Sequence, residues 1–135
     1  MNGPYLLDTN MISYAASGRS PEALRRITSR PAGDILISVI SYAEVRYGLV
    51  RRPGATRLET ATRALFAESI ILPWTTSTAD LYSDLRSTME RDGKSLTPLD
   101  MFIAAHALEA GATLVSADTA FRHVPGLMVE DWSVV

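Results

Sequence analysis

The sequence contains no cysteine and only a single lysine. The absence of cysteine excludes disulfides, thiol catalysis and cysteine-based zinc sites. No apolar run approaches the roughly 20 residues that a membrane-spanning helix needs. The first four residues, Met1-Asn2-Gly3-Pro4, lack the basic and apolar regions of a secretory signal. We therefore expect a cytoplasmic protein that does not enter a membrane.

The composition is that of one globular domain, which we expect to span residues 1–135. Hydrophobic residues make up 47% of the chain and charged residues 21%, which argues against disorder. The net charge of −2 does not by itself suggest a nucleic-acid partner. Twelve of the 13 basic residues are arginine, which binds phosphate through two parallel hydrogen bonds. A codon bias toward arginine is the alternative explanation.

Apolar runs of strand length alternate with stretches of helical period, which predicts an α/β fold with a parallel sheet. The expected strands are Tyr5–Asp8, Ile35–Ser38, Ile70–Leu72, Thr113–Ser116 and Leu127–Val129. The expected helices are Asn10–Ala16, Pro21–Ser29, Ser41–Arg51, Thr56–Glu68, Thr78–Arg91 and Leu99–Ala110.

Four carboxylates lie where an apolar run meets a polar turn or a helix start. Asp8 and Asp118 follow strands, whereas Glu44 and Asp100 lie near the beginning of helices. Sites in parallel sheets form beyond the carboxyl ends of the strands, so we expect these acids to converge there. Converging acids repel one another unless a cation lies among them, and oxygen ligands suit Mg²⁺ or Mn²⁺. The pattern indicates a metal-dependent enzyme that acts on phosphate.

Each acid also has a structural explanation, because Asp, Ser and Thr favour helix N-termini. Asp8 and Asp118 could cap the segments that follow them. Thr97-x-x-Asp100 and Ser41-x-x-Glu44 have the spacing of a capping box. Capping alone does not require two acids after strands and two more on helices. The joint pattern therefore favours a functional site.

Several other side chains are assigned to the core or the surface. Trp74 and Trp132 are expected to be packing anchors, with Trp132 fastening the C-terminal tail. The helix from Leu99 is expected to bury one apolar stripe, made of Leu99, Phe102, Ile103 and Ala107. His106 is expected to pack against or border the core. His123 is expected on the surface, so neither histidine is placed for a catalytic triad.

Five segments extend across nearly the whole chain in a fixed order. They are residues 6–10, 37–49, 98–107, 112–118 and 124–132. In this combination the chain resembles a PIN-domain ribonuclease, and more narrowly the VapC toxins of VapBC toxin–antitoxin pairs. The resemblance implies a three-layer fold whose five-stranded parallel sheet has the order 3-2-1-4-5.

The resemblance also implies roles for the four acids. Asp8 and Asp100 would bind the metal directly, and Asp118 would bind it directly or through water. Glu44 would hold a water at the metal. The turn that contains Asp118 is tighter than in many relatives. The resemblance implies three supporting polar residues, which are Thr9, Asn10 and Ser41.

A VapC-like protein would be an endoribonuclease that uses Mg²⁺ or Mn²⁺ to hydrolyse RNA and leaves a 5′-phosphate. The resemblance further implies a homodimer and a cognate VapB-like antitoxin that directs a basic side chain into the acidic pocket. The candidate docking residues are Tyr47, Leu49, Val50, Leu65 and Phe66, of which Leu49 and Leu65 are better explained as core.

Two other readings compete with this one. The non-enzymatic alternative is a PIN-like module that binds RNA or a partner without cutting, but all four acids are present. A phosphotransferase of the haloacid dehalogenase or receiver type is disfavoured. Such a protein expects an Asp at the position of Asn10 and a well-placed lysine, whereas Lys94 lies in a turn.

Overall fold

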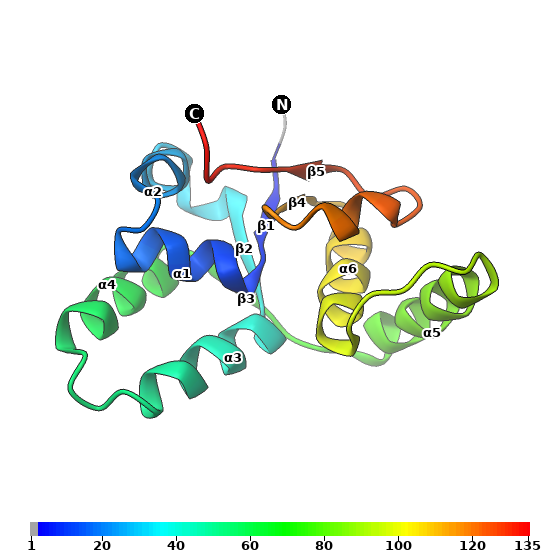
Figure 1. Ribbon diagram of the computed structural model, residues 1–135, viewed down its shortest axis with the longest axis horizontal. Helices are drawn as coiled ribbons and strands as arrows, with labels where there is room; N and C mark the ends of the chain where they lie inside the picture. Colours follow the sequence, from blue (N-terminus) through cyan, green and yellow to red (C-terminus); the bar gives the residue numbers. More distant parts are fainter. Residues whose placement is uncertain (1–2) are drawn as a thin grey trace.

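A computed structural model describes residues 3–135 and places the strands in one parallel sheet of order β3-β2-β1-β4-β5 (Figure 1). This order is the predicted one. The strands are β1 Tyr5–Leu7, β2 Ile35–Ser38, β3 Ile70–Leu72, β4 Thr113–Val115 and β5 Val129–Glu130. The helices are α1 Thr9–Ser17, α2 Pro21–Thr28, α3 Val39–Val50, α4 Thr56–Ala67, α5 Thr76–Arg91 and α6 Pro98–Ala110, with 3-10 turns η1 Ala32–Asp34 and η2 Thr119–His123.

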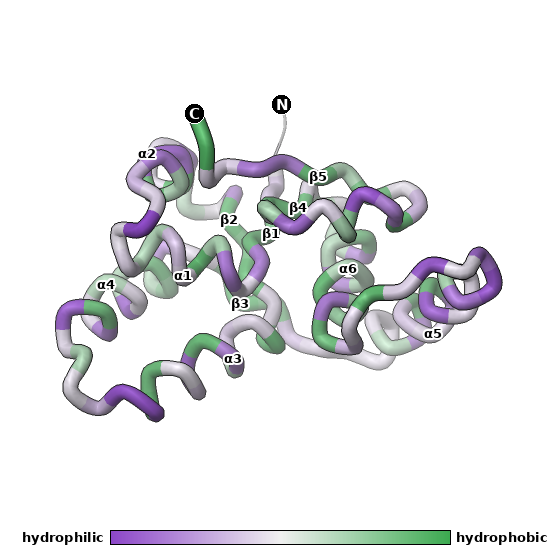
Figure 2. Tube along the Cα trace, in the orientation of Figure 1, coloured by the Kyte–Doolittle hydropathy of each residue, from purple (hydrophilic) through white to green (hydrophobic). Residues whose placement is uncertain are grey.

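Helices cover both faces of the sheet, with α1, α2 and α4 on one side and α5 and α6 on the other (Figure 1). Each face has its own hydrophobic core. In the central strand β1, Tyr5 and Leu7 belong to the first core and Leu6 to the second, and all three are fully buried. Strands β1 and β2 are accordingly hydrophobic along most of their length (Figure 2). None of the helices within residues 3–135 combines the length and apolar character needed to cross a membrane.

The helix starts confirm most of the capping predictions. The Asp8 carboxylate accepts a hydrogen bond from the Met11 backbone N–H at 2.8 Å and caps α1. The Thr97 hydroxyl accepts from the Asp100 N–H at 3.2 Å and caps α6. Gly111 ends α6 with φ of 64°, a conformation that favours glycine.

Three sequence predictions are wrong in detail. Helix α3 begins at Val39 and is capped by Ser38, so Ser41 and Glu44 do not form a capping box. Strand β5 begins at Val129, two residues later than predicted. Leu99 is 44% exposed, because it lies on the outer side of the first turn of α6 while the following turns face the core.

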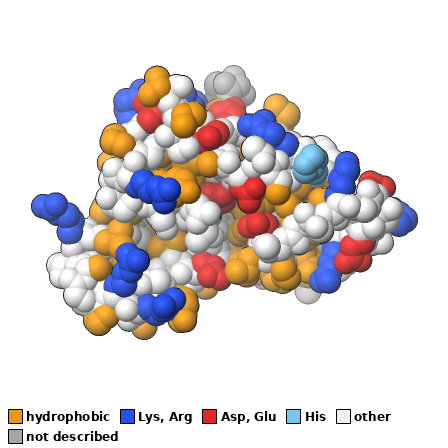
Figure 3. All heavy atoms as spheres, in the orientation of Figure 1, with side chains coloured by type: hydrophobic (Ala, Val, Ile, Leu, Met, Phe, Trp, Pro, Cys, Tyr) orange, Lys and Arg blue, Asp and Glu red, His pale blue; other side chains and the backbone are white. Residues whose placement is uncertain are grey.

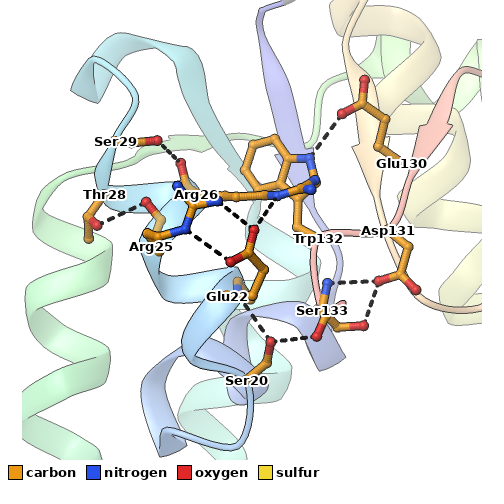
Figure 4. A network of polar contacts seen from close by, with 11 residues as sticks. Ser20, Glu22, Arg25, Arg26, Thr28, Ser29, Glu130, Asp131, Trp132 and Ser133 are labelled. Atoms are coloured by element: carbon orange, nitrogen blue, oxygen red, sulfur yellow. Dashed lines mark hydrogen bonds and ion pairs between the residues drawn. The ribbon is translucent and has the colours of Figure 1, made fainter. Parts of the chain in front are cut away.

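Trp132 anchors the C-terminal tail, as predicted. Its side chain is 1% exposed and its ring packs against Tyr5 with the centroids 4.8 Å apart. The indole N–H donates to Glu130 at 3.0 Å (Figure 4). The Ser20 hydroxyl donates to the Ser133 carbonyl at 2.9 Å, so the tail is also joined to the start of α2 (Figure 4).

His106 is a buried structural residue, as predicted. Its Nδ1 lies 2.8 Å from the Ser38 hydroxyl and its Nε2 lies 3.1 Å from the Pro73 carbonyl. A carbonyl only accepts, so Nε2 donates to Pro73 and Nδ1 accepts from Ser38. Ser38 in turn accepts from the Ile40 N–H at the start of α3. The contact joins α6, which bears Asp100, to α3, which bears Glu44.

Candidate active site

The ends of β1 and β4 bring two acids to one edge of the sheet. The two strands are neighbours, and Leu7 pairs with Val115 at their carboxyl ends. Asp8 follows β1 directly, and Asp118 lies in the turn after β4 that leads into η2. Asp100 joins them from the first turn of α6. Acidic side chains gather at the centre of this face of the molecule (Figure 3).

Asp8 is the most strongly perturbed of these acids. The residue is 6% exposed, and the pKa of its carboxyl group is raised from 3.8 to about 6, mainly by burial. The negative charges of Asp100 and Asp118 contribute smaller parts of this rise. Hydrogen bonds from Ser116 and from the Met11 backbone oppose the rise in pKa, because they stabilise the charged form.

Asp100 and Asp118 interact in the same way. Asp100 is half-buried, and its pKa is raised first by this burial and then by the charge of Asp118, while a hydrogen bond with Thr97 lowers it. The Asp118 carboxylate accepts from the Ala120 N–H at 2.9 Å, and its own N–H donates to Ser116 at 3.0 Å. Asp118 is close enough to the other two acids for its charge to raise the pKa of both.

Glu44 lies apart from this trio. It is half-buried on α3, and the acids that act on Asp8 are Asp100 and Asp118. Glu44 instead lines an adjacent cleft together with Thr9 and Asn10. Three of the four predicted acids are thus within electrostatic reach of one another, and the fourth lies apart from them in the adjacent cleft.

The predicted supporting residues have different surroundings. The Thr9 hydroxyl donates to the Ser41 hydroxyl at 3.0 Å, which joins the start of α1 to α3. Ser41 is fully buried, so it holds Thr9 in place and does not itself face solvent. Asn10 is exposed at the rim of the cleft.

The donor set suits a hard divalent cation. Asp8, Asp100 and Asp118 offer only carboxylate oxygens, which are the ligands that such a cation prefers. Burial first, and then neighbouring negative charge, raises the pKa of Asp8 and of Asp100, and a bound cation would oppose both shifts. Within residues 3–135, no three acidic or histidine side chains are drawn together tightly enough to enclose an ion as they stand. Asp8 and Asp118 each accept a hydrogen bond from a backbone N–H, which orients their carboxylates.

A cleft of about 540 Å³ lies between α1, α3 and α4, and it reaches Thr9, the residue that follows Asp8. Its rim near the site holds Thr9, Asn10 and Glu44, and three arginines also line it. Basic side chains lie to the left of the acidic cluster, over α1 and the end of α3 (Figure 3). The lining residues are Thr9, Asn10, Ser13, Tyr14, Ser17, Arg19, Glu44, Val45, Gly48, Leu49, Arg51, Arg52, Leu58 and Thr62.

Sequence reasoning missed two parts of this region. Ser116 was assigned only to a strand end, yet it contacts both Asp8 and the Asp118 backbone. The clustering of Arg19, Arg51 and Arg52 was not predicted either, since it depends on how α1 packs against α3. The sequence offers one signal for Ser116, which is that a hydroxyl side chain lies between the end of a strand and Asp118.

The candidate docking residues differ in their exposure to solvent. Tyr47 and Val50 are 60% and 70% exposed on α3. Leu49 and Leu65 are buried, which confirms their reading as core. Phe66 is half-buried against Tyr42, with the ring centroids 4.8 Å apart.

The doubly covered parallel sheet with acids at its carboxyl edge matches a known class of domain, since the PIN domain profile aligns with residues 5–127. Ribonuclease VapC2 of Haemophilus influenzae is 30% identical over 129 residues, which are 95% of this chain and 97% of that protein. The tRNA(fMet)-specific endonuclease VapC of Shigella flexneri is 27% identical over 130 residues, which are 96% and 98% of the two chains.

Solved structures give the same result. The crystal structure of VapBC2 from Rickettsia felis, bound to a DNA fragment from its promoter, contains a chain that superposes with a TM-score of 0.85 and 27% identity. The match covers 95% of this chain and 98% of that one. The chain belongs to the PIN-domain family and, within it, to the VapC ribonucleases.

Proposed function

We propose that the chain is a metal-dependent endoribonuclease and the toxin of a toxin–antitoxin pair. The main support is the approach of Asp8, Asp100 and Asp118 at the carboxyl edge of the sheet, where the charge of Asp118 raises the pKa of both Asp8 and Asp100. Burial of Asp8 has a cost in the absence of a counter-ion, and a divalent cation would offset it. The VapC relatives named above are ribonucleases, which agrees with this chemistry.

In this proposal Asp8 and Asp100 bind Mg²⁺ or Mn²⁺ directly, and Asp118 binds it directly or through water. The ion supplies a Lewis acid that offsets the charge developing on the phosphoryl oxygens and makes water more acidic. Asp8 must be ionised to bind a cation, and a pKa of about 6 leaves it largely ionised at pH 7. The Met11 N–H fixes the orientation of this carboxylate.

Glu44 has a separate role in the proposal. Its carboxylate borders the cleft beside the trio, where it can accept a hydrogen bond from the attacking water and orient it. The hydrogen bond between Thr9 and Ser41 joins the start of α1, which follows Asp8, to α3, which bears Glu44. In-line attack on the phosphodiester would then leave a 5′-phosphate and a 3′-hydroxyl.

The proposed partner is a VapB-like antitoxin, because the solved relatives include VapBC complexes. A second groove, of about 650 Å³ and mostly apolar, lies between α1, α2 and α4 and suits the apolar face of an antitoxin segment. A basic side chain following that segment would neutralise the acidic trio. We also propose that the protein forms a homodimer in the cytoplasm, as the family resemblance implies.

The experiment is an RNA cleavage assay on the purified chain without antitoxin. Mg²⁺ or Mn²⁺ should support cleavage, chelator should abolish it, and the products should carry 5′-phosphates that accept an adapter by ligation. Asp100→Asn should lose cleavage, whereas Asp84→Asn, an exposed residue on α5, should retain it. Full cleavage by Asp100→Asn would overturn the proposed role. RNA binding without any cleavage would favour the non-catalytic module.

A further inference from the structure

The two ends of the cleft between α1, α3 and α4 differ in their chemistry. One end is formed by Thr9, Asn10 and Glu44, and Thr9 directly follows Asp8 in the chain. The other end is formed by basic side chains from the α1–α2 turn and from the end of α3. Its volume of about 540 Å³ falls within the range of sites that enclose a ligand. A ligand lying along this cleft would therefore enter the site of the acids from one side.

Arg19, Arg51 and Arg52 are exposed, and none of them forms an ion pair with an acid among residues 3–135. Other arginines of the chain are engaged differently, since Arg63 pairs with Glu59 at 2.9 Å. An arginine without a carboxylate partner keeps all of its donors for a phosphate.

The charge and chemistry of the lining favour a polyanion. Glu44 is the only acid of the cleft, and it lies at the end nearest the proposed metal site. Apart from the arginines, the other polar side chains of the lining are neutral: the amide of Asn10 and hydroxyls such as those of Ser13 and Ser17. A chain of phosphates could thus follow the cleft without meeting an acid until it reaches the catalytic region.

Tyrosine rings lie next to two of these arginines. Tyr14 is half-buried on α1 and lines the cleft, with the Arg19 guanidinium 4.6 Å from the centre of its ring. The Arg51 guanidinium lies 5.6 Å from the ring of Tyr47. Stacked rings and guanidinium groups form the kind of surface on which unpaired bases stack. Double-stranded RNA would not expose its bases in this way.

We propose that this cleft is a binding subsite for single-stranded RNA on one side of the scissile phosphate. Arg19, Arg51 and Arg52 bind successive phosphates, and Tyr14 supports an unpaired base. This subsite rests on the proposed nuclease function. It also explains how a chain with net charge −2 brings a polyanion to a cluster of acids.

The test measures RNA binding and cleavage separately. A fluorescein-labelled single-stranded RNA of about 12 nucleotides is titrated in chelator and followed by anisotropy, and its cleavage is measured with Mn²⁺. The variants are Arg51→Ala with Arg52→Ala, and Tyr14→Leu. The matched control is Arg86→Ala with Arg91→Ala, which removes the same charge from exposed positions on α5.

The arginine pair should weaken RNA binding about tenfold, and the slope of log Kd against log salt should fall by about 1.4, since each single-strand phosphate contact contributes about 0.7. In the cleavage assay, KM should rise while kcat stays near its wild-type value. Tyr14→Leu should weaken binding with no change in salt slope, and the control pair should leave both quantities near wild type.

Two results would overturn the subsite. One is an arginine variant that retains wild-type Kd and salt slope while the wild-type chain cuts RNA. The other is unchanged RNA binding with weakened antitoxin binding, which would assign the cleft to an acidic protein segment. Failure of the nuclease function would look different, because the wild-type chain would bind RNA through the arginines and leave it intact.

Discussion

Replacing Asp8 by Asn should make the metal-free protein more stable at neutral pH. Burial and two neighbouring acids raise the Asp8 pKa from 3.8 to about 6. At 1.36 kcal/mol per pKa unit, ionised Asp8 costs the folded state roughly 3 kcal/mol at pH 7. Asn removes the charge but keeps an oxygen that can accept from the Met11 N–H. The free energy of unfolding should therefore increase by close to this roughly 3 kcal/mol. Any loss of the contact with Ser116 would reduce the increase.

The sign of the pH dependence follows from the raised pKa. Folded Asp8 binds its proton more tightly than unfolded Asp8, so its contribution is most favourable below pH 3.8 and is lost as the pH rises through about 6. The stability advantage of Asp8→Asn should be greatest at pH 7 and should vanish near pH 4. This behaviour is the reverse of that of a salt-bridged carboxylate.

Urea denaturation in the presence of chelator measures this effect. The free energy of unfolding of wild type, Asp8→Asn and the exposed control Asp84→Asn is determined at pH 4 and pH 7. Adding Mg²⁺ or Mn²⁺ should then stabilise wild type and leave Asp8→Asn unchanged. An Asp8→Asn variant that is equal to or less stable than wild type at pH 7 would refute the electrostatic reasoning.

Three further outcomes follow from the same structure. Burial lowers the pKa of His106, so the stability that its neutral form contributes should be lost as the pH falls below 6.5, the ordinary pKa of histidine. Urea denaturation of the Asp8→Asn variant measures this loss, and a free energy of unfolding that does not change with pH would contradict it. Because protons compete with cations for Asp8, the affinity for Mn²⁺ measured by calorimetry should weaken about tenfold per pH unit below pH 6, and a constant affinity from pH 7 to 5 would count against the assignment. Trp132→Ala should cost about 3–5 kcal/mol in thermal or urea unfolding, since its ring is buried against Tyr5, and a wild-type midpoint would show that the tail is not an anchor.

The sequence predicted the order and type of the elements because apolar runs and helical periods are local properties. The edges of the elements were less accurate where a distant partner defines them. Strand β5 begins at Val129 because its backbone pairs with Leu114 of β4. Helix α3 begins at Val39 because Ser38, which caps it, is fixed by His106 from 68 residues away.

For the site, too, the sequence predicted the local features and not those that depend on distant parts of the chain. Asp8 and Asp118 were found from their places after strands, and Asp100 from its place at a helix start. Their electrostatic coupling depends on the pairing of β1 with β4, which is not a local feature. The contact of Ser116 with Asp8 has the same origin.

The most direct measurement of the central claim is the position of a bound ion. Crystals of the chain grown with Mn²⁺ and measured for anomalous scattering should show one or more peaks about 2 Å from carboxylate oxygens of Asp8 and Asp100. Asp8→Asn crystals should lose that density. Strong manganese peaks elsewhere, with none at Asp8 and Asp100 in a preparation that cuts RNA, would contradict the account.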